Sequence, residues 1–473
     1  MQESGEHHDL QEILRRRVDA APHAVLLERG TERWTNAEFA GICGQLARRL
    51  QCLPGVGNVI GVSAESSRFL PFLLWASILA RLDLLLLPAF RRPEMLEAAV
   101  EPLGLRAVFS DAENMVLRSG FIRLDRIMEF AASDPGDPGV ALPDATVTPA
   151  FVFQTSGTEG APKSVRCEHW KFARVIEAML GDGALAHARE CRAFISQPLV
   201  HSYGLCAFLE YCAAEATVVL PPENSALGPV GDLMNAERFR SIEAIEGVPY
   251  FWSQFAKLRS KIRLPALRHL GLGGGRLDPA IMRNIVDQHP GATISVRYGL
   301  TETPSVATHK VYRPPHRPEQ DWISSGRVIS AYEVEIRGEN GQLVVAGSEG
   351  EIFVLGTCVS DPSGELRTGD LGYFDDAGEL IVTGRRSAFI KRRGYRLSPE
   401  MIEAAASQCE GIRDCRAVGR GEQLILEVVL ARPRSDVELL AALRQRLSDT
   451  MVPDLLVRVE QIPRTYSGKI KRS

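Results

Sequence analysis

The amino-acid sequence predicts an α/β protein of more than one domain. Segments with helical spacing of apolar residues alternate with short apolar runs of strand length, which is typical of helices packed on mainly parallel sheets. The chain has 473 residues, 45% of them hydrophobic, and exceeds what one hydrophobic core usually organises. We therefore expect a large α/β part followed by a smaller domain.

The N-terminal elements follow from this alternation. Residues 9–21 and 36–52 have helical spacing. The most apolar stretch, 69–87, contains Pro71, Arg81 and Asp83, so it predicts a buried helix and a buried strand rather than a membrane span, in which a charge is costly. Further strands are expected at 59–62, 84–87, 103–110, 150–154, 217–220, 267–271 and 293–296.

From about Ser330 the pattern changes to short alternating strands with turns, which indicates a small β subdomain. Its strands are expected at 332–336, 341–345, 350–355 and 380–383. Beyond it, helical segments at 398–408 and 436–447 enclose a strand hairpin at 417–431 that is broken at 419–421. We place an N-terminal core at 1–384, a hinge at 385–388 and a compact α+β domain at 389–473.

Composition excludes several classes of protein. The 55 Lys and Arg nearly balance the 59 Asp and Glu, which argues against a dedicated nucleic-acid binder. The balance is uneven, because residues 385–473 carry 18 basic against 11 acidic side chains. The nine cysteines are scattered and never spaced as CxxC, and the first residues lack an export signal. We expect no disulfides, no zinc site and a cytoplasmic protein.

A loop suited to anions follows the strand expected at 150–154. The sequence FVFQTSGTEGAPK at 151–163 combines hydroxyl residues, glycines and a lysine, whose donors can surround phosphate oxygens. Its spacing is not that of a Walker A motif, and a plain polar turn is the alternative. The candidate phosphate ligands are Thr155, Ser156, Gly157, Thr158, Gly160 and Lys163.

Four later segments support nucleotide binding. The sequence YGLTET at 298–303 offers a ring for stacking on a base and a carboxylate for Mg²⁺. The sequence RTGD at 367–370 supplies a turn ending in a carboxylate that can accept from a ribose diol, or is a plain turn between strands. The basic segment 384–396 joins the two domains, and PRTYSGK at 463–469 places a lysine after a glycine near the end of the sequence.

In this order, the five segments resemble the core motifs of the ANL superfamily of adenylate-forming enzymes, which includes acyl- and aryl-CoA synthetases, nonribosomal adenylation domains and luciferases. The resemblance extends over about 25–471, and QPLVHSYG at 197–204 and GLGGG at 271–275 are similar to weaker family motifs. It implies a large N-terminal adenylate-forming domain, with two α/β sheet subdomains and a small β subdomain, and a small mobile C-terminal α+β lid.

The resemblance also implies a role for each matched residue. Tyr298 would stack on adenine, Glu302 would bind Mg²⁺ with help from Thr158, and Asp370 would hold the ribose with help from Arg385. Lys469 would be the catalytic lysine of adenylate formation. In this reaction the carboxylate of the substrate attacks the α-phosphate of ATP, so that two anions come together. The remaining candidates for ATP binding are Gly273, Gly274, Gly275, Gly299 and Thr301.

The expected substrate is a carboxylic acid without an α-amine. Amino-acid-activating relatives usually carry an Asp near the PLxH segment, and none occurs between Ser196 and Phe208; an ammonium group buried without a partner is costly. Bulky rings predict an aryl or short-acyl acid, although an aromatic cluster is often core packing. His201 is a pocket wall, a core histidine or a helper in thiol transfer. The expected pocket residues are His201, Tyr203, Gly204, Tyr250, Phe251, Trp252, Gly273, Gly274 and Ser305.

The acyl acceptor is expected to be the phosphopantetheine thiol of CoA or of a carrier protein acting in trans, and the sequence does not choose between them. Two departures from the family pattern stand out: Ser387 at the hinge, where a charged residue is usual, and Asp83, where glycine is usual. We expect Asp83 to be structural. The alternatives are a non-catalytic nucleotide- or acyl-binding protein, an adenylating enzyme whose second step uses no thiol and, less favoured, an amino-acid-activating enzyme.

Overall fold

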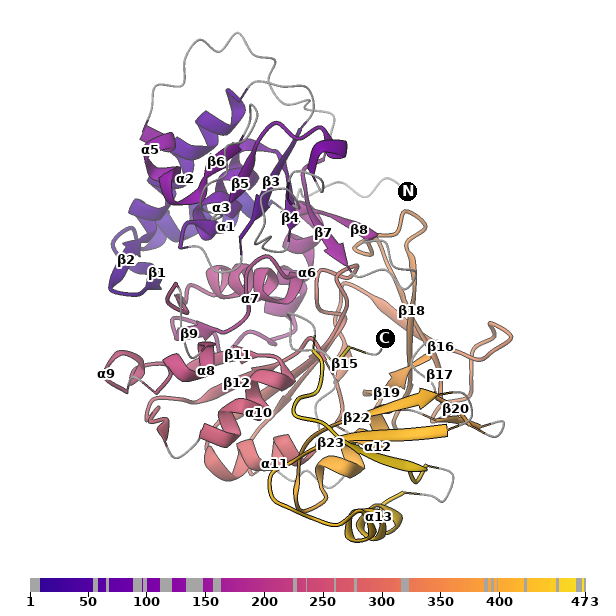
Figure 1. The fold of residues 1–473 in the computed structure, drawn as a ribbon. Coiled ribbons are helices and arrows are strands. Elements are labelled where there is room, and N and C mark those ends of the chain that lie inside the picture. The colour runs from indigo at the N-terminus through magenta and orange to yellow at the C-terminus, as the bar shows by residue number, and fades with distance from the viewer. Residues whose placement is uncertain are drawn as a thin grey trace.

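The computed structural model describes most of the chain (Figure 1). The described residues are 9–53, 58–64, 68–87, 96, 100–110, 121–132, 148–155, 163–223, 228–234, 236–258, 261–275, 279–315, 323–386, 390–392, 395–397, 399–420, 423–447, 451–464 and 470–471.

A nine-stranded sheet forms the first layer, in the order β15-β14-β13-β12-β11-β9-β10-β1-β2. Its six central strands, from β13 to β1, pair in parallel, and the pairs at both edges are antiparallel. The strands are β1 (Val25–Arg29), β2 (Glu32–Thr35), β9 (Arg192–Ile195), β10 (Thr217–Leu220), β11 (Ala244–Gly247), β12 (His269–Leu272), β13 (Thr293–Tyr298), β14 (Thr308–Tyr312) and β15 (Arg327–Val328).

A six-stranded sheet forms the second layer, in the order β6-β5-β3-β4-β7-β8. All of its pairs are parallel except the hairpin of β7 and β8. The predicted mainly parallel sheets are therefore confirmed. The strands are β3 (Val59–Ser63), β4 (Asp83–Leu87), β5 (Val108–Ser110), β6 (Phe121–Arg123), β7 (Ala150–Thr155) and β8 (Lys163–Glu168).

Helices pack between and around the two sheets, and α6 and α7 lie between them (Figure 1). Helix α2 begins at a capping box made by Thr35 and Glu38. Helix α3 is apolar on all sides and buried, and β4 follows it, as predicted for 69–87. The helices are α1 (Leu10–Ala20), α2 (Asn36–Gln51), α3 (Leu70–Ala80), α5 (Ile127–Ala132), α6 (His169–Gly181), α7 (Ser202–Ala213), α8 (Gly228–Asp232), α9 (Ala236–Phe239), α10 (Pro249–Leu258) and α11 (Pro279–Gln288), with 3-10 turns η1 (Glu101–Leu103) and η2 (Leu124–Arg126).

Asp83 has a structural role, as expected. Its carboxylate accepts from the backbone N–H of Ala150 at 2.8 Å and from the guanidinium of Arg166 at 3.0 and 3.1 Å. The side chain thereby ties β4 to β7 and β8. A glycine there could make neither bond.

The small β subdomain is an antiparallel sheet of β16 (Glu333–Arg337), β17 (Gly350–Leu355), β18 (Glu365–Phe374) and β19 (Leu380–Arg385). The strand predicted at 341–345 is wrong: one bridge joins Arg337 to Leu343, and glycines at 341 and 347 have positive φ. The turn considered at 367–370 lies inside β18, where Gly369 has a φ of 73°.

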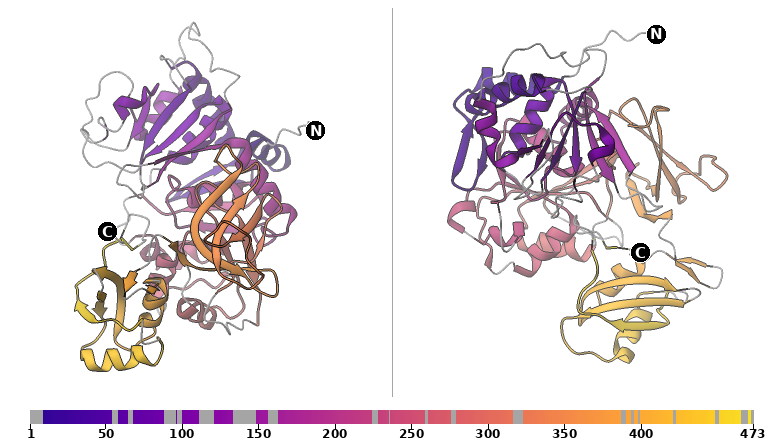
Figure 2. Two further views of the ribbon diagram at one scale, coloured as in Figure 1. Left: turned by 90° about the vertical axis from the view of Figure 1, so that its right-hand side faces the viewer. Right: turned by 45° about the horizontal axis from the view of Figure 1, so that its top comes forward.

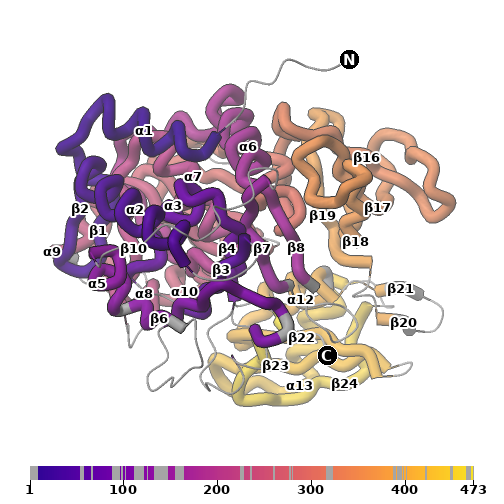
Figure 3. Tube along the Cα trace, turned by 90° about the horizontal axis from the view of Figure 1, so that it is seen from above, coloured from indigo at the N-terminus to yellow at the C-terminus, as the bar shows by residue number. Residues whose placement is uncertain are grey.

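The C-terminal residues form a separate lobe (Figures 2 and 3) with its own hydrophobic core, which includes Ile390, Ile402, Leu426 and Leu456. The predicted helices and the hairpin are confirmed. Among the described residues, no helix is long and apolar enough to cross a membrane. The elements are β20 (Ile390–Arg392), β21 (Tyr395–Leu397), α12 (Pro399–Ser407), β22 (Ile412–Arg420), β23 (Gln423–Leu430), α13 (Asp436–Arg444) and β24 (Leu455–Arg458).

Candidate functional site

The carboxyl ends of β11, β12 and β13 lie side by side, because these strands pair in parallel. Ligands of α/β sheets usually bind beyond this edge. Gly273 and Tyr298 stand there, and Tyr203 from the first turn of α7 reaches the same place, since its ring is the nearest neighbour of Gly273.

Three predicted nucleotide residues converge from two sheets. The hydroxyl of Tyr298 donates to Asp370 Oδ2 at 2.9 Å, and Arg385 Nε donates to Asp370 Oδ1 at 2.7 Å. Asp370 and Arg385 face each other in the register of β18 and β19. The nearby Asp370 carboxylate raises the pKa of Arg385, while burial and the same carboxylate raise the pKa of Tyr298. The half-buried ring of Tyr298 thus lies beside the Asp370 carboxylate, and Arg385 balances the charge of this carboxylate.

The loop after β13 is tightly folded. A Cβ on Gly299 would lie 2.3 Å from the carbonyl oxygen of Ser305, so only glycine fits there without a shift of the backbone. Thr301 Oγ1 lies 3.2 Å from Ser202 Oγ, and the carbonyl oxygen of Glu302 accepts from the N–H of Ser360 at 2.8 Å. These contacts hold the backbone of Glu302 between α7 and the small β subdomain.

The predicted phosphate loop connects β7 to β8, whose last antiparallel pair is Thr155 with Lys163. The loop residues Ser156, Gly157, Thr158 and Gly160 lie outside the described residues, as do the side chains of Thr155 and Lys163.

The base of this hairpin is close to the Glu302 loop. Cys167 of β8 lies 3.2 Å from the carbonyl oxygen of Thr301 and 2.9 Å from Ser360 Oγ. Burial raises the pKa of the Cys167 thiol to about 12, so this cysteine is a hydrogen-bonding thiol and not a thiolate nucleophile.

The glycine segment after β12 makes close contacts with Tyr203 and Pro249. A Cβ on Gly273 would lie 2.8 Å from Tyr203 Cε2, and one on Gly275 would lie 3.5 Å from Pro249. Gly274 has a φ of 74°. Gly204 is just as constrained, because a Cβ there would lie 2.3 Å from the carbonyl oxygen of Pro198.

The aromatic residues at 250–252 have different surroundings from those expected. Trp252 is fully buried and donates from its indole N–H to the carbonyl oxygen of Gly271 at 3.1 Å. Phe251 packs edge-to-face against it within a cluster of buried apolar side chains. Tyr250 is 41% exposed and its ring lies under the guanidinium of Arg464 at 5.0 Å. Phe251 and Trp252 therefore pack in the core, the alternative noted for an aromatic cluster, and Tyr250 faces the C-terminal lobe.

His201 occupies the N-cap position of α7, and its backbone N–H donates to the carbonyl oxygen of Pro198 at 3.1 Å. Ser305 is buried with a φ of 69°. Both stand on segments that border the strand ends.

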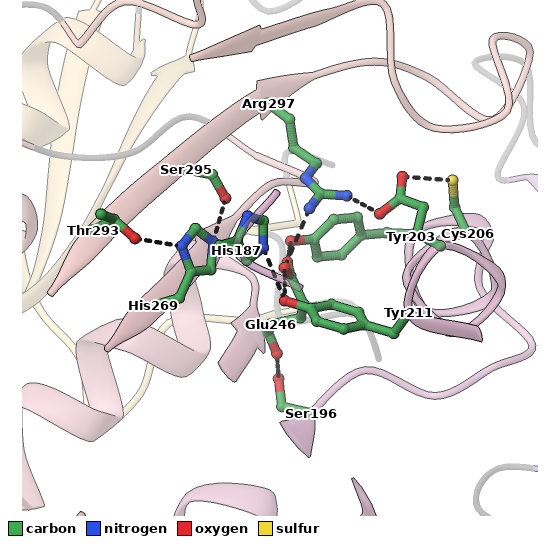
Figure 4. A network of polar contacts seen from close by, with 12 residues as sticks. His187, Ser196, Tyr203, Cys206, Tyr211, Glu246, His269, Thr293, Ser295 and Arg297 are labelled. Atoms are coloured by element: carbon green, nitrogen blue, oxygen red, sulfur yellow. Dashed lines mark hydrogen bonds and ion pairs between the residues drawn. The ribbon is translucent and has the colours of Figure 1, made fainter. Parts of the chain in front are cut away.

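A buried polar network, which the sequence analysis missed, lies under Tyr203 (Figure 4). Glu246 of β11 accepts from Tyr203 at 2.7 Å, from Tyr211 at 3.0 Å and from Arg297 at 3.2 Å. Arg297 also pairs with Glu210, and all three charged side chains are at most 1% exposed. A charged residue inside an apolar strand, as in AIEG at 244–247 and TISVRY at 293–298, is the signal that could have indicated it, because buried charges need partners.

Two histidines extend this network, but they do not form a metal site with Glu246. The rings of His187 and His269 are stacked, 3.2 Å apart and within 15° of parallel. An imidazole binds a metal through a nitrogen lone pair that lies in the plane of the ring. Because the two ring planes are nearly parallel, the lone pairs of the two histidines cannot point at the same metal ion. Both nitrogens of His269 face hydroxyl groups, those of Thr293 and Ser295.

Lys469 and Ser387 lie outside the described residues, so their predicted roles stay predictions. The chain on both sides of 465–469 is anchored: Arg464 forms a bridge with Ile470, and the N–H of Lys471 donates to the carbonyl oxygen of Pro463 at 2.9 Å. The carbonyl oxygen of Lys471 accepts from Arg416 at 2.7 Å.

Residues 14–361 match the family of AMP-binding enzymes, and residues 401–469 match the AMP-binding enzyme C-terminal domain. The 2-succinylbenzoate–CoA ligase of Bacillus subtilis is 28% identical over 74% of this chain and 73% of its own length. Tyrocidine synthase 2 of Brevibacillus parabrevis is 27% identical over 68% of this chain, which spans only 10% of that synthase.

Solved structures show the same fold. The o-succinylbenzoate CoA synthetase of Bacillus subtilis, in complex with its acyl-adenylate intermediate, has a TM-score of 0.80 at 23% identity and covers 97% of this chain and 96% of its own. An anthranilate CoA ligase in complex with anthranoyl-AMP also has a TM-score of 0.80, at 17% identity over 98% of this chain and 96% of its own.

Proposed function

The chain belongs to the AMP-binding enzyme family, and on that premise we propose that it is an ATP-dependent acid–thiol ligase. It would join a carboxylic acid to AMP with release of pyrophosphate, and would then pass the acyl group to a phosphopantetheine thiol. The relatives named as CoA ligases support CoA as the acceptor.

The meeting of Tyr298, Asp370 and Arg385 supports this proposal most directly. Each oxygen of Asp370 accepts one hydrogen bond, and a carboxylate has further lone pairs for a ribose diol. Arg385 balances its charge, and the ring of Tyr298 would pack on adenine. These contacts favour a nucleoside-binding role for residues 367–370 over the alternative of a plain turn between strands.

In the first step, a carboxylate oxygen attacks the α-phosphorus of ATP, and pyrophosphate leaves with the electron pair of the broken P–O bond. Lys469 would place its ammonium group between the two anions and so lower their repulsion. Glu302 and Thr158 would supply oxygen ligands for Mg²⁺, the kind this ion prefers, and the bound ion would neutralise phosphate charge.

In the second step, the thiol attacks the acyl carbon and AMP leaves. The C-terminal lobe has its own core, which supports the proposed domains at 1–384 and 389–473 and a hinge at 385–388 about which the lobe turns between the steps.

The nine cysteines are all free thiols among the described residues, in line with action in the reducing cytoplasm.

The substrate we propose is an aryl or short-acyl acid without an α-amine. Glu210 and Glu246 lie near Tyr203, but the side chains of both are 0% exposed and turned toward Arg297, so neither is open to the ammonium group of a substrate.

Pyrophosphate exchange over panels of aryl, short-acyl and amino acids tests the first step, and thioester formation with CoA or a phosphopantetheinylated carrier protein tests the second. We expect exchange with an aryl or short-acyl acid, and a CoA thioester. Exchange with amino acids alone would overturn the substrate class. Nucleotide binding without exchange on any acid would establish a non-catalytic binding protein, and acyl-adenylate without any thioester would establish a different second step.

A further inference from the structure

The ring of Tyr203 fills the space beside the glycine segment that follows β12. A Cβ on Gly273 would lie 2.8 and 3.0 Å from two ring carbons of Tyr203, and one on Gly274 would lie 3.8 Å from a third. The ring therefore faces this segment along an edge several atoms long. Tyr203 itself is 7% exposed, so little room is left around it.

Tyr203 is fixed in this position from below. Its hydroxyl donates to Glu246 Oε2 at 2.7 Å, and the guanidinium of Arg297 lies 5.7 Å from its ring centre. Rotation of the side chain away from Gly273 would break the bond to a carboxylate that is 0% exposed. A buried acceptor that loses its donor is costly, so the ring is a rigid wall rather than a movable one.

The carboxylate of Glu246 cannot shift to follow the ring. It also accepts from Tyr211 and Arg297. A Cβ on Gly271 of the neighbouring strand would lie 2.1 Å from Oε2 of Glu246, so this strand packs directly on the carboxylate. The position of Tyr203 is thus set by β11, β12 and β13 together.

From this geometry we infer that Tyr203 is the specificity-determining residue that limits the depth of the acyl pocket, and that Glu246 is a positioning residue that holds it there. The inference rests on the proposed function, because it assumes that the acid lies along the glycine segment 273–275. The fixed ring of Tyr203 would leave room for a short acid but would block a long aliphatic chain.

The test compares kcat/KM for pyrophosphate exchange over straight-chain acids of increasing length and over benzoates with increasing para-alkyl groups. Tyr203→Ala removes the wall, and we expect the ratio of long-acid to short-acid kcat/KM to rise about tenfold or more, since even one methylene group in a pocket changes discrimination by that factor. Tyr203→Phe keeps the wall but removes its tether, and should relax the ratio partly.

Tyr211→Phe is the matched control. It removes the same kind of hydroxyl donor from the same carboxylate, but its ring lies beside His187 and not beside the glycine segment. We expect its length profile to match that of the wild type. Thermal unfolding checks that each variant folds, and Tyr203→Leu replaces Tyr203→Ala if the latter does not.

The outcomes separate the two claims. A wild type active on short acids, with a length profile unchanged in folded Tyr203→Ala or Tyr203→Leu, would overturn the inference and leave the proposed function intact. A shift of equal size in Tyr211→Phe and Tyr203→Phe would mean that Glu246 acts on general stability and does not position the wall. A wild type that exchanges pyrophosphate with no acid would overturn the proposed function, and the inference with it.

Discussion

The hydroxyl of Tyr298 donates a hydrogen bond to Asp370 across 2.9 Å. Tyr298 ends β13 of the nine-stranded sheet and Asp370 lies in β18 of the small sheet, so this bond joins two subdomains at the place proposed for the nucleoside. A bound nucleoside would therefore contact both subdomains.

Asp370→Asn is expected to raise the KM for ATP by tenfold or more with little change in the KM for the acid. The amide has one acceptor oxygen in place of two and no charge for Arg385. Steady-state exchange with each substrate varied in turn measures this. Tyr298→Phe, which removes only the hydroxyl, should have a much smaller effect; an unchanged KM for ATP in Asp370→Asn would contradict the ribose assignment.

Lys469→Ala is expected to abolish acyl-adenylate formation while the N-terminal domain stays folded. The loss would be of charge stabilisation in the transition state, for which a factor of about 10² or more is typical. Pyrophosphate exchange measures it, with Lys471→Ala as the control, because Lys471 is exposed and uses only its backbone groups in the contacts described. Near-normal exchange in Lys469→Ala would exclude the proposed role.

Glu302→Gln should weaken the response to Mg²⁺ rather than the fold. Its backbone bond to Ser360 is unaffected by the substitution, whereas the amide is a poorer ligand for a hard cation. We expect the Mg²⁺ concentration at half-maximal exchange to rise, with an unchanged melting temperature. Full activity at limiting Mg²⁺ would show that the metal is held elsewhere.

Ser387→Pro should separate the two half-reactions, because proline fixes φ at the proposed hinge and restricts the residue before it. A lobe held in the adenylating position would still exchange pyrophosphate but would transfer the acyl group slowly. The comparison is exchange against single-turnover transfer from preformed acyl-adenylate, with Ser387→Ala as control. Equal losses in both steps, or none in either, would mean that no rotation occurs about this residue.

His169 should make the protein less stable in acid. Burial lowers its pKa from the usual 6.5 to about 3, so below pH 6.5 the unfolded chain binds a proton that the folded chain does not. The free energy of unfolding then falls with decreasing pH, by up to about 1.4 kcal/mol per pH unit from this one group, until about pH 3.

His169→Phe should remove this part of the pH dependence, and the new ring can stack on Phe151, which now lies 4.4 Å from the imidazole centre. Denaturant unfolding between pH 4 and pH 8 measures the slope. His23→Phe, at an exposed position, is the control. An identical slope in His169→Phe and the wild type would show that His169 is protonated in the folded protein.

Most of the secondary structure could be predicted because it depends on local spacing. The helix and strand expected at 69–87 became α3 and β4 because nearly every side chain there is apolar and can be buried on all sides. The segment 341–345 was predicted wrongly because its contact with β16 is a single bridge, and Leu343 and Val345, two apolar residues of its alternating pattern, are exposed.

Sequence alone determined which residue types the candidate nucleotide site contains, because each motif is a short continuous segment of the chain. Tyr298 and Glu302 belong to one such segment, and Asp370 belongs to another. Which of them touch depended on how strands far apart in the sequence align. Arg385 meets Asp370 through the register of β18 with β19, and Tyr203 of α7 meets Glu246 of β11 because α7 packs on β9, which pairs with β11. Such contacts arise from the burial of whole surfaces, whose partners local patterns do not specify.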